Sequence, residues 1–144
     1  MNHALENVKV VSLGSSVSAP LCARLLGDMG AEVIKVERPD GGDFSRGWDD
    51  VAGGFSSAHL WCNPNKKSIT LNLKEPEGRK ILLKLAAQAD VFIENFSPGV
   101  VENLGVDYPS IKGVRPDILY CSISGYGQDG PYRDNRALDA LIQG

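Results

Sequence analysis

Three basic side chains stand beside predicted turns, at positions suited to contact with an anionic ligand. Arg38 and Lys74 each follow a run with the pattern of a strand, and Arg136 precedes the last apolar stretch. A guanidinium group makes planar, bidentate contacts with phosphate, and a lysine ammonium binds phosphate as a compact charge. Taken singly, each residue would more often be a surface cation of little energetic value. Phosphate contact and ordinary surface charge are therefore the two interpretations.

Glu37, at the end of the second predicted strand, also has two interpretations. In dehydrogenases an acidic residue at such a position holds a ribose hydroxyl. The first strand-to-helix turn, residues 14–20, has one glycine where the dinucleotide fingerprint has three, so the sequence gives NAD binding little support. A solvated charge beside a turn is the more common situation for a glutamate, and we expect it here.

The nucleophilic side chains do not form a familiar catalytic arrangement. Ser15, Ser16 and Ser18 lie outside any GxSxG context, and His3 and His59 are the only histidines that could serve a serine as base. A hydrolase triad therefore has little support. Three cysteines occur without a CxxC spacing, which predicts reduced thiols and neither a disulfide framework nor a metal site: Cys22, Cys62 and Cys121.

Composition indicates an ordinary globular domain. The chain has 144 residues, of which 42% are hydrophobic and 23% charged, and its formal net charge is −3. That charge, without a block of basic residues, argues against nucleic acid as a partner. No apolar run approaches the roughly 20 residues that a bilayer helix needs, and the N-terminus lacks the pattern of a signal peptide, so we expect a cytoplasmic location and no membrane contact.

The elements that must position these residues alternate between strand and helix. Period-two and compact apolar runs predict strands at residues 8–13, 31–37, 68–73, 91–93 and 118–122, with helical segments between them. Ser18 before Pro20 predicts an N-cap, and the helix that follows is expected to face the sheet with Leu21, Leu25, Leu26 and Met29. This alternation is typical of a parallel α/β sheet with crossover helices.

Two long loops are predicted at the carboxyl ends of strands, at residues 39–54 and 125–131. The first contains five glycines, and the second has the glycine-rich sequence GYGQDGP. Long loops in compact domains are usually functional, and open α/β sheets bind ligands at this edge. The helical pattern at 137–143 is unfinished at residue 144, which we interpret as part of something larger.

Four motifs, in order, resemble the family III CoA-transferases, the group that includes formyl-CoA transferase and carnitine CoA-transferase. They are GDMGAEVIKVERPDGGD at 27–43, NKKSITLNLKEPEGR at 65–79, DVFIENFSPGVVENLG at 90–105 and CSISGYGQDGPYRD at 121–134. The resemblance covers essentially the whole chain. It implies that residues 1–144 are an incomplete CoA-binding, Rossmann-like domain, the N-terminal third of a longer enzyme. A smaller second domain and two subunits interlocked as a homodimer are also implied.

The resemblance assigns residues to two parts of the ligand. Its CoA-contacting positions fall on Arg38, Leu71, Lys74, Asn95, Phe96 and Arg136, with the cations toward the phosphates and Asn95-Phe96 near the adenine and pantetheine arm. The positions near the reacting thioester fall on Ser16, Val17, Ser18 and Trp48. Two departures from formyl-CoA transferase are Asn103 in place of an arginine, which removes one phosphate contact, and Val17 in place of a glutamine, which argues against formyl-CoA as substrate.

The family mechanism implies no permanently bound cofactor and no metal, with CoA and acyl-CoA as substrates. An aspartate attacks the thioester to form a mixed anhydride, CoA then returns as an aspartyl-CoA thioester, and the acceptor acid takes the CoA. Asp139 matches a supporting carboxylate of the family, and the nucleophilic aspartate is expected beyond residue 144.

Two alternatives to a transferase remain open. The related acyl-CoA racemases place a histidine immediately before the Asp139 position, where this chain has Leu138, and an aliphatic side chain cannot act as a base. The chain by itself could also be a CoA-binding module without turnover. Within the transferase interpretation, residues 42–61 are similar to members that handle dicarboxylic acids, so the expected acceptor is a small organic acid, with a dicarboxylic acid as one option.

Overall fold

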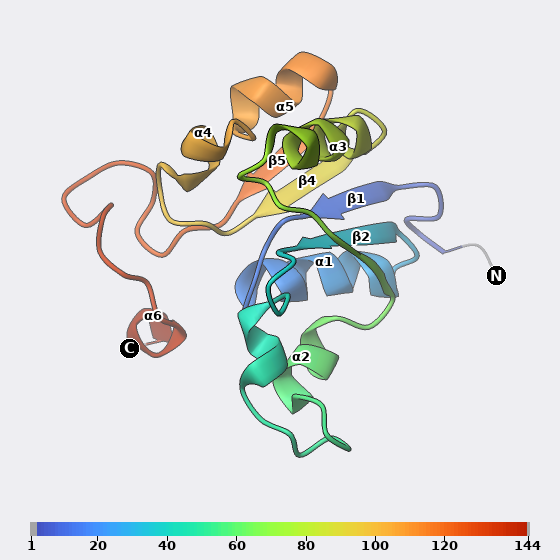
Figure 1. The fold of residues 1–144 in the computed structure, drawn as a ribbon, viewed down its shortest axis with the longest axis vertical. Coiled ribbons are helices and arrows are strands. Elements are labelled where there is room, and N and C mark those ends of the chain that lie inside the picture. The colour runs from blue at the N-terminus through green and yellow to red at the C-terminus, as the bar shows by residue number, and fades with distance from the viewer. Residues whose placement is uncertain (1–2, 144) are drawn as a thin grey trace.

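The predicted alternation folds into one parallel sheet with helices on both faces (Figure 1). The structure is a computed structural model, and it describes residues 3–143. The strands are β1 (Lys9–Ser12), β2 (Glu32–Glu37), β3 (Lys66–Thr70), β4 (Val91–Glu94) and β5 (Leu119–Ser122). The helices are α1 (Ser18–Asp28), η1 (Phe44–Gly47), α2 (Ser57–Cys62), α3 (Pro76–Ala86), α4 (Val100–Leu104), α5 (Tyr108–Val114) and α6 (Asp139–Gln143). The α/β prediction is confirmed.

The strand order creates a crevice at the centre of the sheet. The order is β3-β2-β1-β4-β5, and every neighbouring pair is parallel. The chain moves from β1 outward to β2 and β3, then crosses back to place β4 on the other side of β1. Ligands of open α/β sheets bind where the order reverses in this way, outside the carboxyl ends of the strands. In this protein that place lies between β1 and β4.

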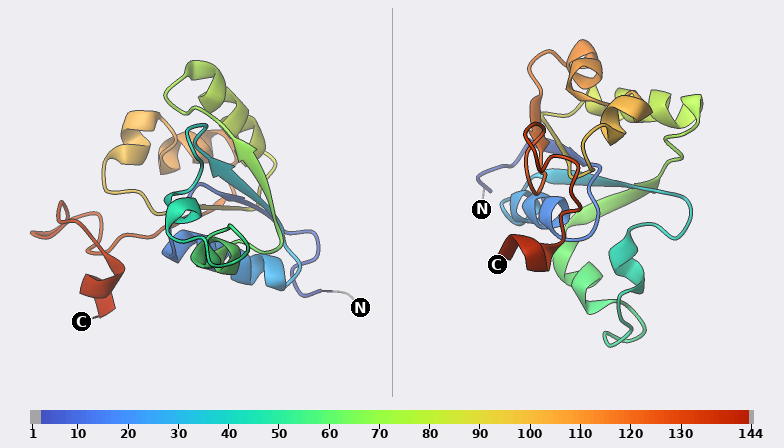
Figure 2. Two further views of the ribbon diagram at one scale, coloured as in Figure 1. Left: turned by 60° about the horizontal axis from the view of Figure 1, so that its bottom comes forward. Right: turned by 90° about the vertical axis from the view of Figure 1, so that its left-hand side faces the viewer.

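Successive residues of the central strands point into two different cores. Val11 and Phe92 belong to the apolar cluster under α3, α4 and α5, while their neighbours Val10 and Ile93 pack with α1. Both clusters are fully covered because a parallel sheet carries helices on both faces. Figure 2 shows these two layers, and shows the segment after β5 leaving the sheet edge as an arm that ends in α6.

Helix α1 differs from its prediction in two respects. Val17 is the N-cap, no side chain caps the helix, and Ser18 is its first helical residue. Leu25 and Met29 are 53% and 44% exposed, whereas Ala19 and Ala23 are fully buried. Small side chains at 19 and 23 let the helix lie close to the strands, so the buried stripe is centred on the alanines and not on the larger residues.

The segment after β3 also differs from the pattern of its sequence. The strand ends at Thr70 and not at residue 73, although the Leu71 amide still donates to the Glu37 carbonyl at 2.9 Å. The chain then turns so that Asn72 lies against α3 at Gly78, where any Cβ would overlap the Asn72 carbonyl oxygen. This close approach explains the early end of the strand. In residues 3–143, no helix is long and apolar enough to cross a membrane.

Candidate active site

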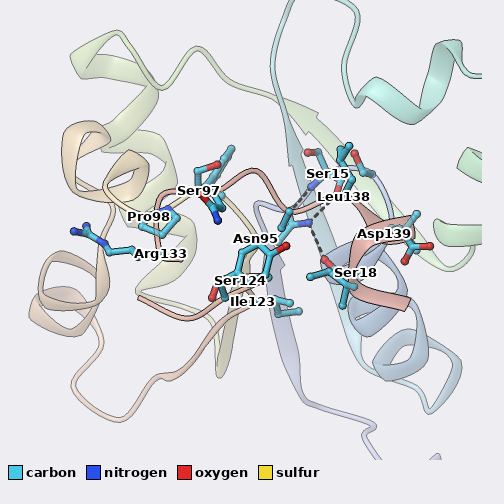
Figure 3. Close-up of a pocket in the computed structure, with 18 of the residues that line it drawn as sticks. Ser15, Ser18, Asn95, Ser97, Pro98, Ile123, Ser124, Arg133, Leu138 and Asp139 are labelled. Carbon is cyan, nitrogen blue, oxygen red and sulfur yellow. Dashed lines mark hydrogen bonds between the residues drawn. The ribbon is translucent and has the colours of Figure 1, made fainter. Parts of the chain in front are cut away.

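A cavity of about 520 Å³ opens at the crevice between β1 and β4. One wall is the turn after β1, with Ser15 to Ser18, and the next is the turn after β4, with Asn95 to Pro98 (Figure 3). Trp48 from the 39–54 loop lines it, and the segment after β5 closes it with side chains that include Ile123, Ser124, Tyr126, Arg133, Leu138 and Asp139. The location agrees with the one that the strand order predicts.

Asn95 joins the two turns across the cavity floor. Its amide oxygen accepts a hydrogen bond from the Ser15 backbone amide at 2.9 Å. Its amide nitrogen donates to the Ser15 carbonyl and to Ser18 Oγ, both at 2.9 Å. Figure 3 shows Asn95 between these two serines. Gly14 permits this contact, since a Cβ at that position would overlap the Ala19 side chain and approach Asn95 Oδ1 to 2.9 Å.

A buried ion pair holds the same turn from behind. Lys35 Nζ lies 2.6 Å from Asp43 Oδ2, and the two side chains are only 2% and 1% exposed. Lys35 also donates to the Gly14 carbonyl at 2.9 Å. Asp43 Oδ1 accepts from the Ser16 amide at 3.0 Å and from the Ser45 amide at 2.9 Å. Burial raises the pKa of Asp43, but the hydrogen bonds from Lys35, Ser16 and Ser45 outweigh it and lower the pKa below its usual value.

Glu37 is buried, so the expectation of a solvated charge was wrong. Only 5% of the residue is exposed. Its Oε1 accepts from Arg46 and from Ser68 Oγ at 2.7 Å each, and its Oε2 accepts from Arg46 Nε and the Asp43 amide at 2.8 Å. Burial raises the pKa of Glu37, but these hydrogen bonds and the Arg46 charge lower it to about 2. Glu37 therefore anchors the 39–54 loop to the sheet.

His59 lies apart from the serine turn. It is on α2, 9% exposed, with Nδ1 2.9 Å from Ser45 Oγ. Burial lowers the pKa of its imidazole, which favours the neutral ring. Among the described residues that line the cavity there is no histidine, so no Ser-His pair forms there.

Two of the predicted phosphate ligands lie beyond the cavity, at the ends of β2 and β3. Arg38 donates to the Gly42 carbonyl at 2.8 Å, and its guanidinium carbon lies 4.2 Å from the centre of the Phe44 ring. Lys74 follows the turn that begins at Asn72, whose side chain accepts from the Lys74 amide at 3.1 Å. Within residues 3–143, neither Arg38 nor Lys74 forms an ion pair. Both cations therefore lie without an ion-pair partner among the described residues, beyond the carboxyl ends of β2 and β3.

The other predicted contacts divide between the cavity and its surroundings. Phe96 lines the cavity, with its amide held by Glu94 Oε2 at 2.9 Å. Leu71 is 8% exposed and belongs to the core. Arg136 is exposed between two lining residues, Asn135 and Ala137, without lining the cavity itself. Asp139 lines the cavity as the first residue of α6 and is exposed.

The structure brings the serine turn, Asn95, Phe96, Trp48 and Asp139, all of them singled out in the sequence, to one cavity. The groups behind that cavity were not predicted from the sequence. Lys35 and Asp43 both lie within the motif at 27–43, but the resemblance assigns neither of them a role. The available signal was Lys35 inside the apolar run Val33-Ile34-Lys35-Val36, since a buried ammonium needs a partner of opposite charge. The three cysteines are free thiols, and the described residues contain no cluster of three or more potential metal ligands.

Fold and site together define a parallel α/β protein with a cavity at its topological switch point. A sequence model described as CoA-transferase family III matches residues 5–144, and the chain belongs to that family. Human succinyl-CoA:glutarate CoA-transferase is 47% identical over 138 residues, which are 95% of this chain and 32% of that protein. The formyl-CoA:oxalate CoA-transferase of Bradyrhizobium sp. is 40% identical over 99% of this chain and 34% of its own length.

A solved structure has the same fold. The crystal structure of a CAIB/BAIF family protein from Brucella suis superposes with a TM-score of 0.91 and 42% sequence identity, over 99% of this chain and 39% of that one. The chain thus spans about a third of the length of the curated relatives named above.

Proposed function

We propose that this chain supplies the CoA-binding part of an enzyme that transfers CoA from an acyl-CoA donor to a small dicarboxylic acid. The observation that carries the proposal is the cavity between β1 and β4, which has polar groups converging from three segments of the chain. The names of the relatives support the acid: glutarate in the human protein and in one from Agrobacterium fabrum, 41% identical, and oxalate in the Bradyrhizobium protein.

The spacing of the candidate contacts suits a long ligand. Arg38 and Lys74 lie at the ends of β2 and β3, whereas the cavity lies between β1 and β4. Three strand spacings separate β3 from β4, roughly 14 Å at about 4.8 Å each. In the proposed mode the CoA phosphates contact Arg38, Lys74 and Arg136. The pantetheine arm then follows the carboxyl edge past Leu71, Asn95 and Phe96.

The reacting thioester is proposed to lie against Ser16, Val17, Ser18 and Trp48. The amino end of α1 borders the cavity, without a side-chain cap and without an acidic residue in its first turn. The helix dipole there favours negative charge, such as the oxyanion that forms when a carboxylate attacks a thioester. Asp139 would support that carboxylate as a second acid, and the attacking aspartate itself is not assigned to this chain.

Wider features of the proposed enzyme rest on the same family membership. They are a covalent aspartyl-CoA intermediate, a second and smaller domain, an interlocked homodimer and a cytoplasmic location. Leu138, which lines the cavity, stands where the racemase interpretation needs a histidine, and this favours transfer over racemisation.

Calorimetry with free CoA tests the binding half of the proposal. We expect saturable binding, and Arg38→Ala should weaken it by about tenfold or more, because a charge-assisted contact contributes roughly 1.5–3 kcal/mol. Lys112→Ala is the matched control, since Lys112 lies on α5 over the Tyr108 ring. A folded sample that binds no CoA at millimolar concentration would refute the assignment.

Isotope exchange tests the reaction. The full-length enzyme, which includes the attacking aspartate in addition to this chain, is incubated in deuterated water with succinyl-CoA, with and without glutarate. We expect glutaryl-CoA only when glutarate is present, and no deuterium at the acyl α-carbon. Rapid exchange at that carbon without an acceptor acid would instead establish the racemase alternative.

A further inference from the structure

Ser16 has a backbone conformation that serines rarely adopt. Its φ angle is 65°, in the left-handed region, and the other non-glycine residues with positive φ in residues 3–143 are Asn7 and Asn65. Asparagine enters this region more readily than other residues, because its short side chain can bond locally. Ser16 has no such advantage and lines the cavity. A conformation of this kind persists only where its surroundings enforce it.

The Lys35–Asp43 pair forms hydrogen bonds to both ends of the turn at residues 14–16. Lys35 Nζ donates to the Gly14 carbonyl at 2.9 Å, two residues before Ser16 along the chain. Asp43 Oδ1 accepts from the Ser16 amide at 3.0 Å. Since the two side chains are bonded to each other at 2.6 Å and excluded from solvent, the turn is held between fixed opposite charges.

The same carboxylate is also connected, through η1, to Trp48, another residue that lines the cavity. Asp43 is the N-cap of η1, where its Oδ1 accepts from the Ser45 amide. Trp48 is the C-cap of η1, with its amide bonded to the Ser45 carbonyl at 3.4 Å, and its side chain lines the cavity. One side chain therefore connects the serine turn and the tryptophan, which face the same space.

We propose that Asp43, fixed by Lys35, is a positioning residue that imposes the left-handed conformation of Ser16 and aligns the serine turn with Trp48 for the acyl end of the ligand. The conformational part of the proposal, that Asp43 imposes the left-handed angle of Ser16, rests on the geometry alone. The ligand part, that Asp43 aligns the turn with Trp48 for the acyl group, rests on the proposed function. It assumes that the acyl group occupies this cavity while Arg38 and Lys74 bind the phosphate end of the CoA ligand.

A double-mutant cycle without ligand tests the conformational part. Lys35→Met and Asp43→Leu are introduced together, because removing one partner would leave a buried charge unpaired. In the wild type, Ser16→Gly should raise the midpoint of urea unfolding, since glycine adopts a positive φ without steric cost. In the pair variant Asp43 no longer holds the Ser16 amide, so Ser16→Gly should leave the midpoint unchanged or lower it. An equal shift in both backgrounds would overturn the proposal.

A second, more conservative double substitution keeps the test possible if the first pair variant does not fold. Lys35→Gln with Asp43→Asn keeps the polar shapes and removes both charges. The neutral pair holds Ser16 less firmly, so the rise in midpoint caused by Ser16→Gly should become smaller. A rise equal to that in the wild type would overturn the proposal just as well.

Calorimetry with two ligands tests the ligand part. In the pair variant, we expect succinyl-CoA to bind about tenfold more weakly and free CoA to change by less than about threefold, because only the acyl end loses its alignment. The control is Glu32→Gln with Lys67→Gln, an exposed ion pair with a 2.6 Å contact between β2 and β3. Equal weakening of both ligands would overturn the ligand part. If the wild type binds neither, the proposed function fails, while the unfolding cycle still decides the role of Asp43.

Discussion

Asn95 and Ser15, 80 positions apart in the chain, exchange two hydrogen bonds of 2.9 Å each. The Asn95 side chain accepts from the Ser15 amide and donates to the Ser15 carbonyl, as a neighbouring peptide group would in a sheet. Because Ser15 lies beyond the end of β1 and Asn95 beyond the end of β4, this amide extends the pairing of the two strands to the floor of the cavity.

Replacing this amide should cost both stability and binding. Asn95→Leu keeps the approximate volume but leaves the Ser15 amide and carbonyl without partners, and each unsatisfied group costs about 1–3 kcal/mol when buried. We expect urea denaturation to show that the free energy of unfolding falls by roughly 2 kcal/mol. Calorimetry should show weaker CoA binding. Gln88→Leu is the control, since that side chain is exposed and donates to the Lys84 carbonyl at 3.3 Å, just after the end of α3. An Asn95→Leu protein as stable as the control would contradict the role of the amide.

Gly14 should be intolerant of even one methyl group. Gly14→Ala would overlap the Ala19 side chain and press on Asn95 Oδ1, so α1 or the Asn95 contact must shift. We expect a loss of about 1–3 kcal/mol in the free energy of unfolding. Gly113→Ala is the matched control, because a Cβ there meets nothing within 4 Å and the residue lies inside α5. That control should gain about 0.5–1 kcal/mol, since alanine is the better helix former.

Glu37 should make the protein sensitive to acid. Its pKa falls from 4.5 to about 2 on folding, so its stabilising effect is complete above pH 4.5 and is lost as the pH falls toward 2. The effect should be about 2 kcal/mol, less than the full shift implies, because Arg46 is 43% exposed and solvent screens its charge. Urea denaturation between pH 5 and pH 2 measures it. Glu37→Gln should be less stable at pH 5, and its free energy of unfolding should change less with pH across this range. A variant whose free energy of unfolding depends on pH as steeply as in the wild type would contradict the role of Glu37.

The unpaired cations should make CoA binding depend on salt. Raising the ionic strength from 0.01 M to 0.1 M shortens the screening length from about 30 Å to about 10 Å, which weakens attraction between exposed charges. We expect the CoA affinity of the wild type to fall several-fold over this range in calorimetry. Arg38→Ala with Lys74→Ala should show a much flatter dependence, whereas Lys112→Ala should keep the wild-type slope. Equal slopes in all three proteins would show that these cations do not meet the phosphates.

Local pattern predicted most of the fold because strand and helix periods are properties of short segments. The sequence predicts strands at residues 31–37 and 118–122, and the structure has β2 at Glu32–Glu37 and β5 at Leu119–Ser122. The pattern failed where a contact from another element decided the outcome. Asn72 packs against Gly78 and ends β3 early, and the small Ala19 and Ala23 form the buried face of α1, while Leu25 and Met29 face outward.

The sequence by itself determined the alternation of strands and helices, the ends of strands where ligands bind, and the residues that stand there. Only the tertiary structure decided how the charges are used. Arg38 and Glu37 are neighbours in sequence with the same local context, yet one is stacked on Phe44 at the surface and the other is buried against Arg46. The physical reason is that a charge can be buried only when distant groups compensate it, and strand order brings Lys35, Asp43 and the serine turn together.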